Sequence, residues 1–188
     1  GVPDVTWPGK IKYYALSSGT SEAASKYIPV TKDMLRSNRI NYIRQLLSLL
    51  NYSHLPRQSV TKGFLMLGGA TDLQKGKAGW YAGDLSGILM KNRPFWFQTF
   101  YKPGGRIAKI KDWNEKLHEI VEHARDWDIG YIVGVPAWCQ MCMEMIIDHY
   151  KVKTIHDIWP NFGFFVHGGV AFEPYKKGFE KLLAKPIV

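Results

Sequence analysis

A short loop of small hydroxyl residues and one glycine is the part of this sequence best suited to chemistry. The loop runs from residue 17 to residue 21, after a stretch of strand-forming residues, and a lysine follows a few residues later. In such a loop the backbone N–H groups form a concave anion site, and the hydroxyl groups and the lysine ammonium can bind phosphate oxygens. The candidate phosphate-binding residues are Ser17, Ser18, Gly19, Thr20, Ser21 and Lys26. The loop lacks the Gly-Lys-Ser/Thr triplet of a Walker A motif, and by composition alone it fits an ordinary Ser/Gly turn better.

A second motif, Cys139-Gln140-Met141-Cys142, has the spacing of a zinc or redox pair. It stands alone, whereas a structural zinc site needs about four ligands. Both cysteines fall on the apolar side of a predicted helix, where cysteine packs like a small hydrophobic residue. We therefore predict core packing and no metal site. Five histidines fall on polar segments without a catalytic partner, and we expect them to be solvated: His54, His118, His123, His149 and His156.

Four segments, in this order and spacing, resemble one known family. They are residues 17–31, which contain the loop; Ile132 to Pro136 with the helix after it; Ile158 to Gly169; and Phe172-Glu173-Pro174-Tyr175. Together they are similar to the Gretchen Hagen family of acyl-acid amido synthetases, the auxin-responsive plant enzymes and their bacterial relatives. That family lies within the acyl-adenylate-forming superfamily. The four segments span nearly the whole chain, so the resemblance is specific.

The resemblance implies a parent enzyme that uses ATP and Mg²⁺ to adenylate a carboxylic acid and then passes the acyl group to an amine, with an amino acid as the expected acceptor. It assigns the loop with Lys26 to the ATP phosphates. Adenylation works because AMP is a far better leaving group than hydroxide, and the loop would position the phosphates and stabilise their charge. A paralogue that keeps the fold and has lost catalysis is the alternative within the same family.

The resemblance also places the adenine or acyl pocket near the ends of two predicted strands. Ligands of open α/β sheets gather at the carboxyl ends of the strands. The candidate pocket residues are Val135, Pro136, Trp138, Met141, His167, Gly168 and Gly169. The alternatives are that the Trp138 ring packs in the core and that His167 caps its strand. No residue is assigned a catalytic role.

Two departures from the family pattern bear on function. The family usually has glycine where this chain has Ala23, and alanine costs about 1 kcal/mol if that backbone needs positive φ. The family's Tyr–Ser–Glu and Tyr–Gly–Asp segments, which help to bind adenine, Mg²⁺ and ribose, should follow Gly169, and the sequence reaches Val188 before either. The resemblance therefore implies a piece of a larger adenylating domain. We expect that piece to be inactive alone and to expose apolar surface through which it could form a homodimer.

Composition bounds the remaining possibilities. With 188 residues, 46% hydrophobic and 22% charged, the chain is expected to form one globular domain over residues 1–188. No apolar run is long enough to span a bilayer, and neither a secretory signal nor a disulfide framework is visible, so a cytoplasmic location without membrane partners is expected. The net charge of +9 leaves a basic, aromatic-rich nucleic-acid-binding module as the rival function. Scattered basic residues without a recognisable motif disfavour it.

The elements that must position these residues follow an α/β pattern. Strands are predicted at residues 10–16, 26–30, 63–69, 129–136 and 162–166, and residues 95–101 fit either strand or helix. Thr31 and Asp112 are predicted helix N-caps, the latter in a capping box with Glu115. The helix after Thr31 has an apolar stripe at helical spacing, made of Met34, Ile43, Leu46, Leu47 and Leu50. Short helices are expected at residues 84–90 and after Pro136. Helices alternate with buried strands in the second half, which predicts a mainly parallel sheet flanked by helices.

Overall fold

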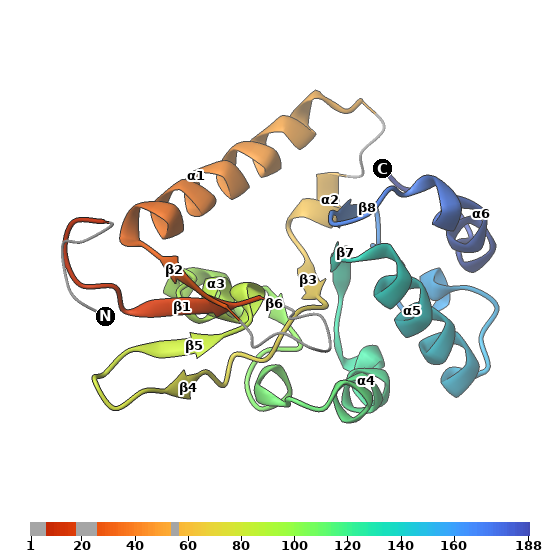
Figure 1. Ribbon diagram of the computed structural model, residues 1–188. Coiled ribbons are helices and arrows are strands. Elements are labelled where there is room, and N and C mark those ends of the chain that lie inside the picture. Colours follow the sequence, from red (N-terminus) through yellow and green to blue (C-terminus); the bar gives the residue numbers. More distant parts are fainter. Residues whose placement is uncertain (1–6, 18–25, 54–56) are drawn as a thin grey trace.

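The computed structural model describes residues 7–17, 26–53 and 57–188, and this part contains two four-stranded sheets (Figure 1). Sheet A has the order β2-β1-β5-β4, and sheet B has the order β6-β3-β7-β8. The strands of sheet A are β1 (Tyr13–Leu16), β2 (Tyr27–Val30), β4 (Gln74–Lys75) and β5 (Tyr81–Gly83). The strands of sheet B are β3 (Gly63–Met66), β6 (Tyr101–Lys102), β7 (Ile129–Gly134) and β8 (Phe164–His167).

The helices fill the connections between these strands. They are α1 (Lys32–Ser48), α2 (Arg57–Val60), α3 (Leu85–Lys91), α4 (Trp113–Glu122), α5 (Pro136–Tyr150) and α6 (Glu173–Leu182). Short 3₁₀ segments are η1 (Leu49–Asn51), η2 (Phe95–Thr99), η3 (Ile107–Lys109), η4 (Ala124–Asp126) and η5 (Ile155–Asp157). The Thr31 hydroxyl accepts a hydrogen bond from the Met34 N–H, and the Asp112 carboxylate accepts one from the Glu115 N–H, so both predicted N-caps are confirmed.

All strand pairs in sheet B are parallel, and its two faces are packed differently. On one face, residues such as Leu65 and Ile132 join the largest core cluster, which α4, α5 and α6 complete. On the other face the rings of Phe64, Tyr131 and Phe164 form a stack across three neighbouring strands, with centroids 5.1 Å and 4.4 Å apart. Residues of α1 and η2 pack on this second face. Figure 1 shows the position of α1. The predicted class, an α/β fold with a parallel sheet flanked by helices, is confirmed.

Sheet A is mixed. Its first two strands form an antiparallel hairpin, and β1 also pairs in parallel with β5. One face of this sheet packs against α3 and the first turn of α1, through a small cluster that includes Tyr13, Val30 and Ile88. The sheet therefore holds the hairpin loop, α1 and α3 in one arrangement.

Several elements differ from expectation in detail. The first strand begins at Tyr13 rather than at residue 10, and residues 95–101 form the 3₁₀ segment η2 followed by the start of β6. No side chain of α1 is fully buried, and Ile43 and Leu47 of its apolar stripe are 40% and 59% exposed. Only part of that stripe therefore packs on the described protein.

The prediction that the two cysteines pack in the core is confirmed, and one histidine prediction is wrong. Cys139 and Cys142 are buried in the main core cluster, where burial raises the pKa of both thiols, that of Cys142 to about 12. His156 is not solvated but 8% exposed. Its Nδ1 accepts a hydrogen bond from the Ala184 N–H at 3.1 Å, and its Nε2 lies 3.0 Å from the Phe162 carbonyl oxygen. Two backbone groups thus replace water around this ring.

Candidate nucleotide and acyl-acid site

The base of the β1–β2 hairpin brings two candidate phosphate-binding residues face to face. The Ser17 N–H donates to the Lys26 carbonyl at 3.1 Å, and the Lys26 N–H donates to the Ser17 hydroxyl at 3.0 Å. The Ser17 amide is therefore engaged in closing the loop. The exposed Lys26 side chain forms no ion pair with any residue in the described ranges. Ser18, Gly19, Thr20, Ser21 and Ala23 lie outside the described residues.

The carboxyl ends of β7 and β8 bring together four of the seven candidate pocket residues. Gly134 pairs with His167, and Val135 follows as the N-cap of α5. A Cβ at Gly169, whose φ is +87°, would lie 3.8 Å from the Val135 Cγ2, whereas a Cβ at Gly168 would meet nothing within 4 Å. Val135, His167 and the two glycines therefore form one exposed edge of the sheet.

The other three candidates lie in the first turns of α5. Pro136 is buried at the first helical position. The Trp138 ring is 41% exposed and packs edge-on against the Trp113 ring of α4 at 4.6 Å, and Met141 is 36% exposed. His167 stacks on Phe165 and Phe172, on the α6 side of sheet B. The Trp138 and His167 rings are thus held by aromatic neighbours on the face of the sheet opposite α1.

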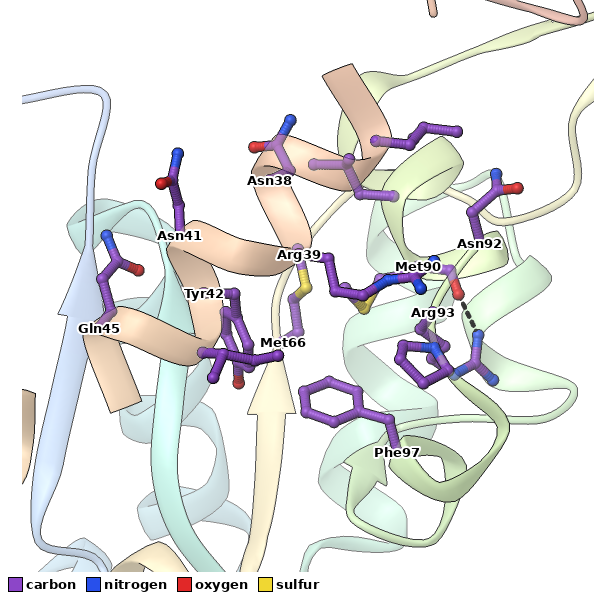
Figure 2. Close-up of a pocket in the computed structure, with 14 residues that line it drawn as sticks. Asn38, Arg39, Asn41, Tyr42, Gln45, Met66, Met90, Asn92, Arg93 and Phe97 are labelled. Atoms are coloured by element: carbon purple, nitrogen blue, oxygen red, sulfur yellow. Dashed lines mark hydrogen bonds between the residues drawn. The ribbon is translucent and has the colours of Figure 1, made fainter. Parts of the chain in front are cut away.

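A pocket on the α1 face was missed by sequence reasoning. It has a volume of about 330 Å³ and lies between α1, α3, η2 and the end of β3. Figure 2 shows Arg39 and Tyr42 of α1 reaching toward Met66, Met90 and Phe97. Amide side chains line it as well, and they are Asn38, Asn41, Gln45 and Asn92. The sequence feature that corresponds to this pocket is the row of amides at positions 38, 41 and 45, which lie on one side of the helix. The helix was predicted from its apolar stripe alone.

A pair of tyrosine hydroxyl groups joins the pocket wall to sheet B. The Tyr42 hydroxyl lies 2.8 Å from that of Tyr131, in the middle of the aromatic stack. Burial raises the pKa of both phenols, that of Tyr131 to about 12. Both groups therefore stay protonated and hydrogen-bonded at neutral pH, which fixes the Tyr42 ring beside the pocket.

Arg93 is held on the opposite side of the pocket. Its Nη1 donates to the Met90 carbonyl, and its guanidinium carbon lies 4.7 Å from the centre of the Tyr101 ring. Its Nε is buried and has no hydrogen-bond partner among the described residues. No Asp or Glu occurs among the residues that line the pocket in the described part of the chain.

A comparison with protein-family models shows the family to which the chain belongs. The model described as the GH3 family N-terminal domain matches residues 1–124, which is 124 of the 188 residues. The chain belongs to the GH3 family. The Gretchen Hagen resemblance is thereby confirmed. The matched GH3 region contains the hairpin loop and every element around the pocket between α1 and α3.

Solved GH3 structures share the fold. AtGH3.15 acyl acid amido synthetase in complex with 2,4-DB aligns with a TM-score of 0.61 and 16% identity over 90% of this chain. Another structure of GH3.15 acyl acid amido synthetase aligns with the same TM-score and 14% identity over 91% of this chain. The alignments cover 39% and 38% of those proteins, so this chain spans about two fifths of their length. No curated protein matches the chain in sequence.

A buried lysine secures the turn after β3 in this GH3 chain. Lys116 of α4 is 4% exposed, and its Nζ donates to the Gly68 carbonyl at 3.2 Å. Burial lowers the pKa of Lys116, and the Asp84 carboxylate opposes that shift. The next residue, Gly69, donates its N–H to the Ser86 hydroxyl at 2.7 Å. The turn is thereby tied to both α4 and α3.

The described residues also bear on metals and membranes. Within them, no three or more His, Cys, Asp or Glu side chains lie close enough together to hold a metal ion. None of the helices in the described ranges combines the length and apolar character that crossing a bilayer requires.

Proposed function

We propose that this chain supplies the ATP phosphate loop and the acid pocket of an ATP-dependent acyl-acid amido synthetase. The observation that carries the proposal is the β1–β2 hairpin in a GH3 N-terminal domain. At its base Ser17 and Lys26 are hydrogen-bonded to each other, and the Lys26 ammonium forms no ion pair with any described residue. GH3.15, whose fold this chain shares, is described as an acyl acid amido synthetase. The reaction would join the acid to AMP with loss of pyrophosphate, and an amino acid would then displace AMP.

The chain's residues would contribute binding and alignment. Ser17 to Ser21 and Lys26 would hold the ATP phosphates, and the exposed edge at Val135, His167 and Gly168-Gly169 would receive the adenylate. The acid body would occupy the pocket between α1 and α3. Sheet B joins the pocket to this exposed edge, because Met66 of the pocket pairs with Val133, two residues before Val135. Aligning two reactants in this way removes much of the entropic barrier to adenylation. When Mg²⁺ is bound with ATP, it would supply positive charge that stabilises the phosphates.

ATP–pyrophosphate exchange tests the proposal. The protein is the complete translation product of the gene that encodes this segment, assayed with a panel of aryl and aliphatic acids. We expect exchange by the wild type and a loss of about tenfold or more in Lys26→Ala, because one charge-assisted phosphate contact contributes roughly 1.5–3 kcal/mol. Lys177→Ala, which removes an exposed lysine on α6, is the matched control and should leave exchange unchanged.

Two results would contradict the proposal. One is the absence of exchange with every acid in the panel. The other is tight oligonucleotide binding with a steep dependence on salt, which is the signature of the nucleic-acid alternative. The 188-residue chain alone is expected to show no exchange, because it spans about two fifths of the solved synthetases and a nucleotide held at one end is poorly aligned.

A further inference from the structure

Among the described residues that line the pocket between α1 and α3 there are two arginines and no Asp or Glu. The Arg39 side chain makes no hydrogen bond or ion pair with any described residue, and Arg93 makes no ion pair within the same ranges. The remaining lining is apolar or amide-bearing. Cations gathered in a concave site without acidic partners favour an anionic ligand.

One side of the Arg93 guanidinium has no hydrogen-bond partner among the described residues. The contact with the Tyr101 ring holds the group in place, and so does the bond from Nη1 to the Met90 carbonyl, which Figure 2 shows. The side that carries Nε and Nη2 remains, and its Nε is buried without a partner. Two parallel N–H groups on one side of a guanidinium match the two oxygens of a carboxylate. A ligand carboxylate would therefore satisfy a donor that the described protein leaves unpaired.

The rest of the pocket specifies what must be attached to that carboxylate. Met66, Met90 and Phe97 provide apolar surface, and the Tyr42 ring is held in place by Tyr131. The volume of about 330 Å³ is at the lower end for small-molecule sites, which run from about 300 to 1,000 Å³. A small aromatic or aliphatic body fits this lining better than a long chain.

We propose that the pocket selects acids that carry a second carboxylate, so that the substrate class of this enzyme is an aryl or short aliphatic dicarboxylic acid. The assignment of the pocket to the acid rests on the function proposed above. One carboxylate is adenylated. The other binds the Nε and Nη2 side of Arg93, and Arg39 adds charge at the pocket's edge. Acids without the second carboxylate leave Arg93 unpaired and bind more weakly.

The test compares three ligands of nearly the same shape by calorimetry on the 188-residue chain without ATP. They are 3-phenylpropanoate, its 4-carboxy derivative, and its 4-carboxamide derivative, which keeps the shape and removes the charge. We expect the dicarboxylate to bind at least tenfold more tightly than the other two. Arg93→Met should abolish this preference, Arg39→Met should reduce it, and Arg36→Met, an exposed position on α1 outside the pocket, should leave it unchanged.

Each outcome decides the inference. The inference would be overturned by equal affinities of the wild type for the three ligands, or by failure of the folded wild-type chain to bind the dicarboxylate. A preference for the dicarboxylate that survives in Arg93→Met would also overturn it. Circular dichroism confirms that each variant is folded. The exchange assay separates the two proposals. Equal exchange with mono- and dicarboxylic acids refutes this inference and keeps the function, whereas dicarboxylate binding without exchange keeps the pocket and refutes the function.

Discussion

The hydroxyl pair of Tyr42 and Tyr131 should control how firmly α1 is attached to sheet B. No side chain of α1 is fully buried, so this 2.8 Å contact is a specific bond in a sparsely packed interface. Tyr42→Phe leaves the Tyr131 hydroxyl unpaired on a side chain that is 3% exposed. An unpaired buried hydroxyl costs about 1–3 kcal/mol, and we expect a loss near 2 kcal/mol in the free energy of unfolding.

The reverse change should cost less. Tyr131→Phe leaves the Tyr42 hydroxyl unpaired, but Tyr42 is only half-buried beside the pocket, where water can reach it, so we expect a loss of about 1 kcal/mol. The double variant leaves no hydroxyl orphaned and should also lose only about 1 kcal/mol, because two hydrogen-bonding partners are removed together. The three losses imply a coupling energy of about 2 kcal/mol, within the range for residues in direct contact.

Urea unfolding of the four proteins measures these losses, and melting temperatures should fall by about 2–4 °C per kcal/mol. Alkaline titration gives an independent reading. Unfolded tyrosines ionise near pH 10, whereas burial raises the pKa of Tyr131 to about 12 and that of Tyr42 further. The contribution of the two hydroxyl groups to the free energy of unfolding is therefore complete below pH 10 and is lost as the pH rises toward 12. The double variant should not show this loss of stability. Losses that simply add in the double variant would refute the reasoning.

Three further predictions concern packing and titration. Cys139 and Cys142 should resist a thiol reagent in the folded chain and react on unfolding, because burial raises the pKa of both; rapid reaction of the native protein would contradict this. Gly134→Ala should lower the free energy of urea unfolding by about 1–3 kcal/mol, because the new Cβ would lie 2.8 Å from the Cys139 Sγ. Gly168→Ala is the control and should leave stability unchanged, because its Cβ would meet nothing within 4 Å. Burial lowers the pKa of His156, so its contribution to the free energy of unfolding is present above about pH 6.5 and is lost as the pH falls. His156→Gln should flatten that loss of stability at low pH. An unchanged dependence of stability on pH in the variant would contradict the prediction.

Local patterns were sufficient for most of the fold. The apolar run at β7 and the Thr31 and Asp112 caps are local signals, and each appears in the structure where the sequence indicated. His156 could not be judged in this way, because its partners at Phe162 and Ala184 are backbone groups that only the tertiary fold brings to the ring. The same holds for Lys116, whose charge is buried against a carbonyl 48 residues away in sequence.

The candidate site was predictable only in part. The hairpin loop is a continuous motif, so its residues could be found from their order alone. The pocket between α1 and α3 is assembled from four elements, and its arginines stand 54 positions apart in the numbering of the chain, so no spacing rule connects Arg39 with Arg93. What the sequence does show is a row of amides at positions 38, 41 and 45 of the helix, and by itself that row fits a solvated helix face.

The difference between the two faces of sheet B explains why a binding site would lie on the α1 side. The α4–α5–α6 face includes fully buried residues such as Trp159 and Met143, so it has little freedom to admit a ligand. On the other face the aromatic stack is buried, but α1 itself contributes only half-buried contacts and the Tyr42 hydroxyl bond, and regions with few buried contacts open most easily. A ligand that bridges Arg39 of α1 and Arg93 beyond α3 would supply the missing contacts. It should therefore stabilise α1 in proportion to its occupancy, by linkage between binding and folding.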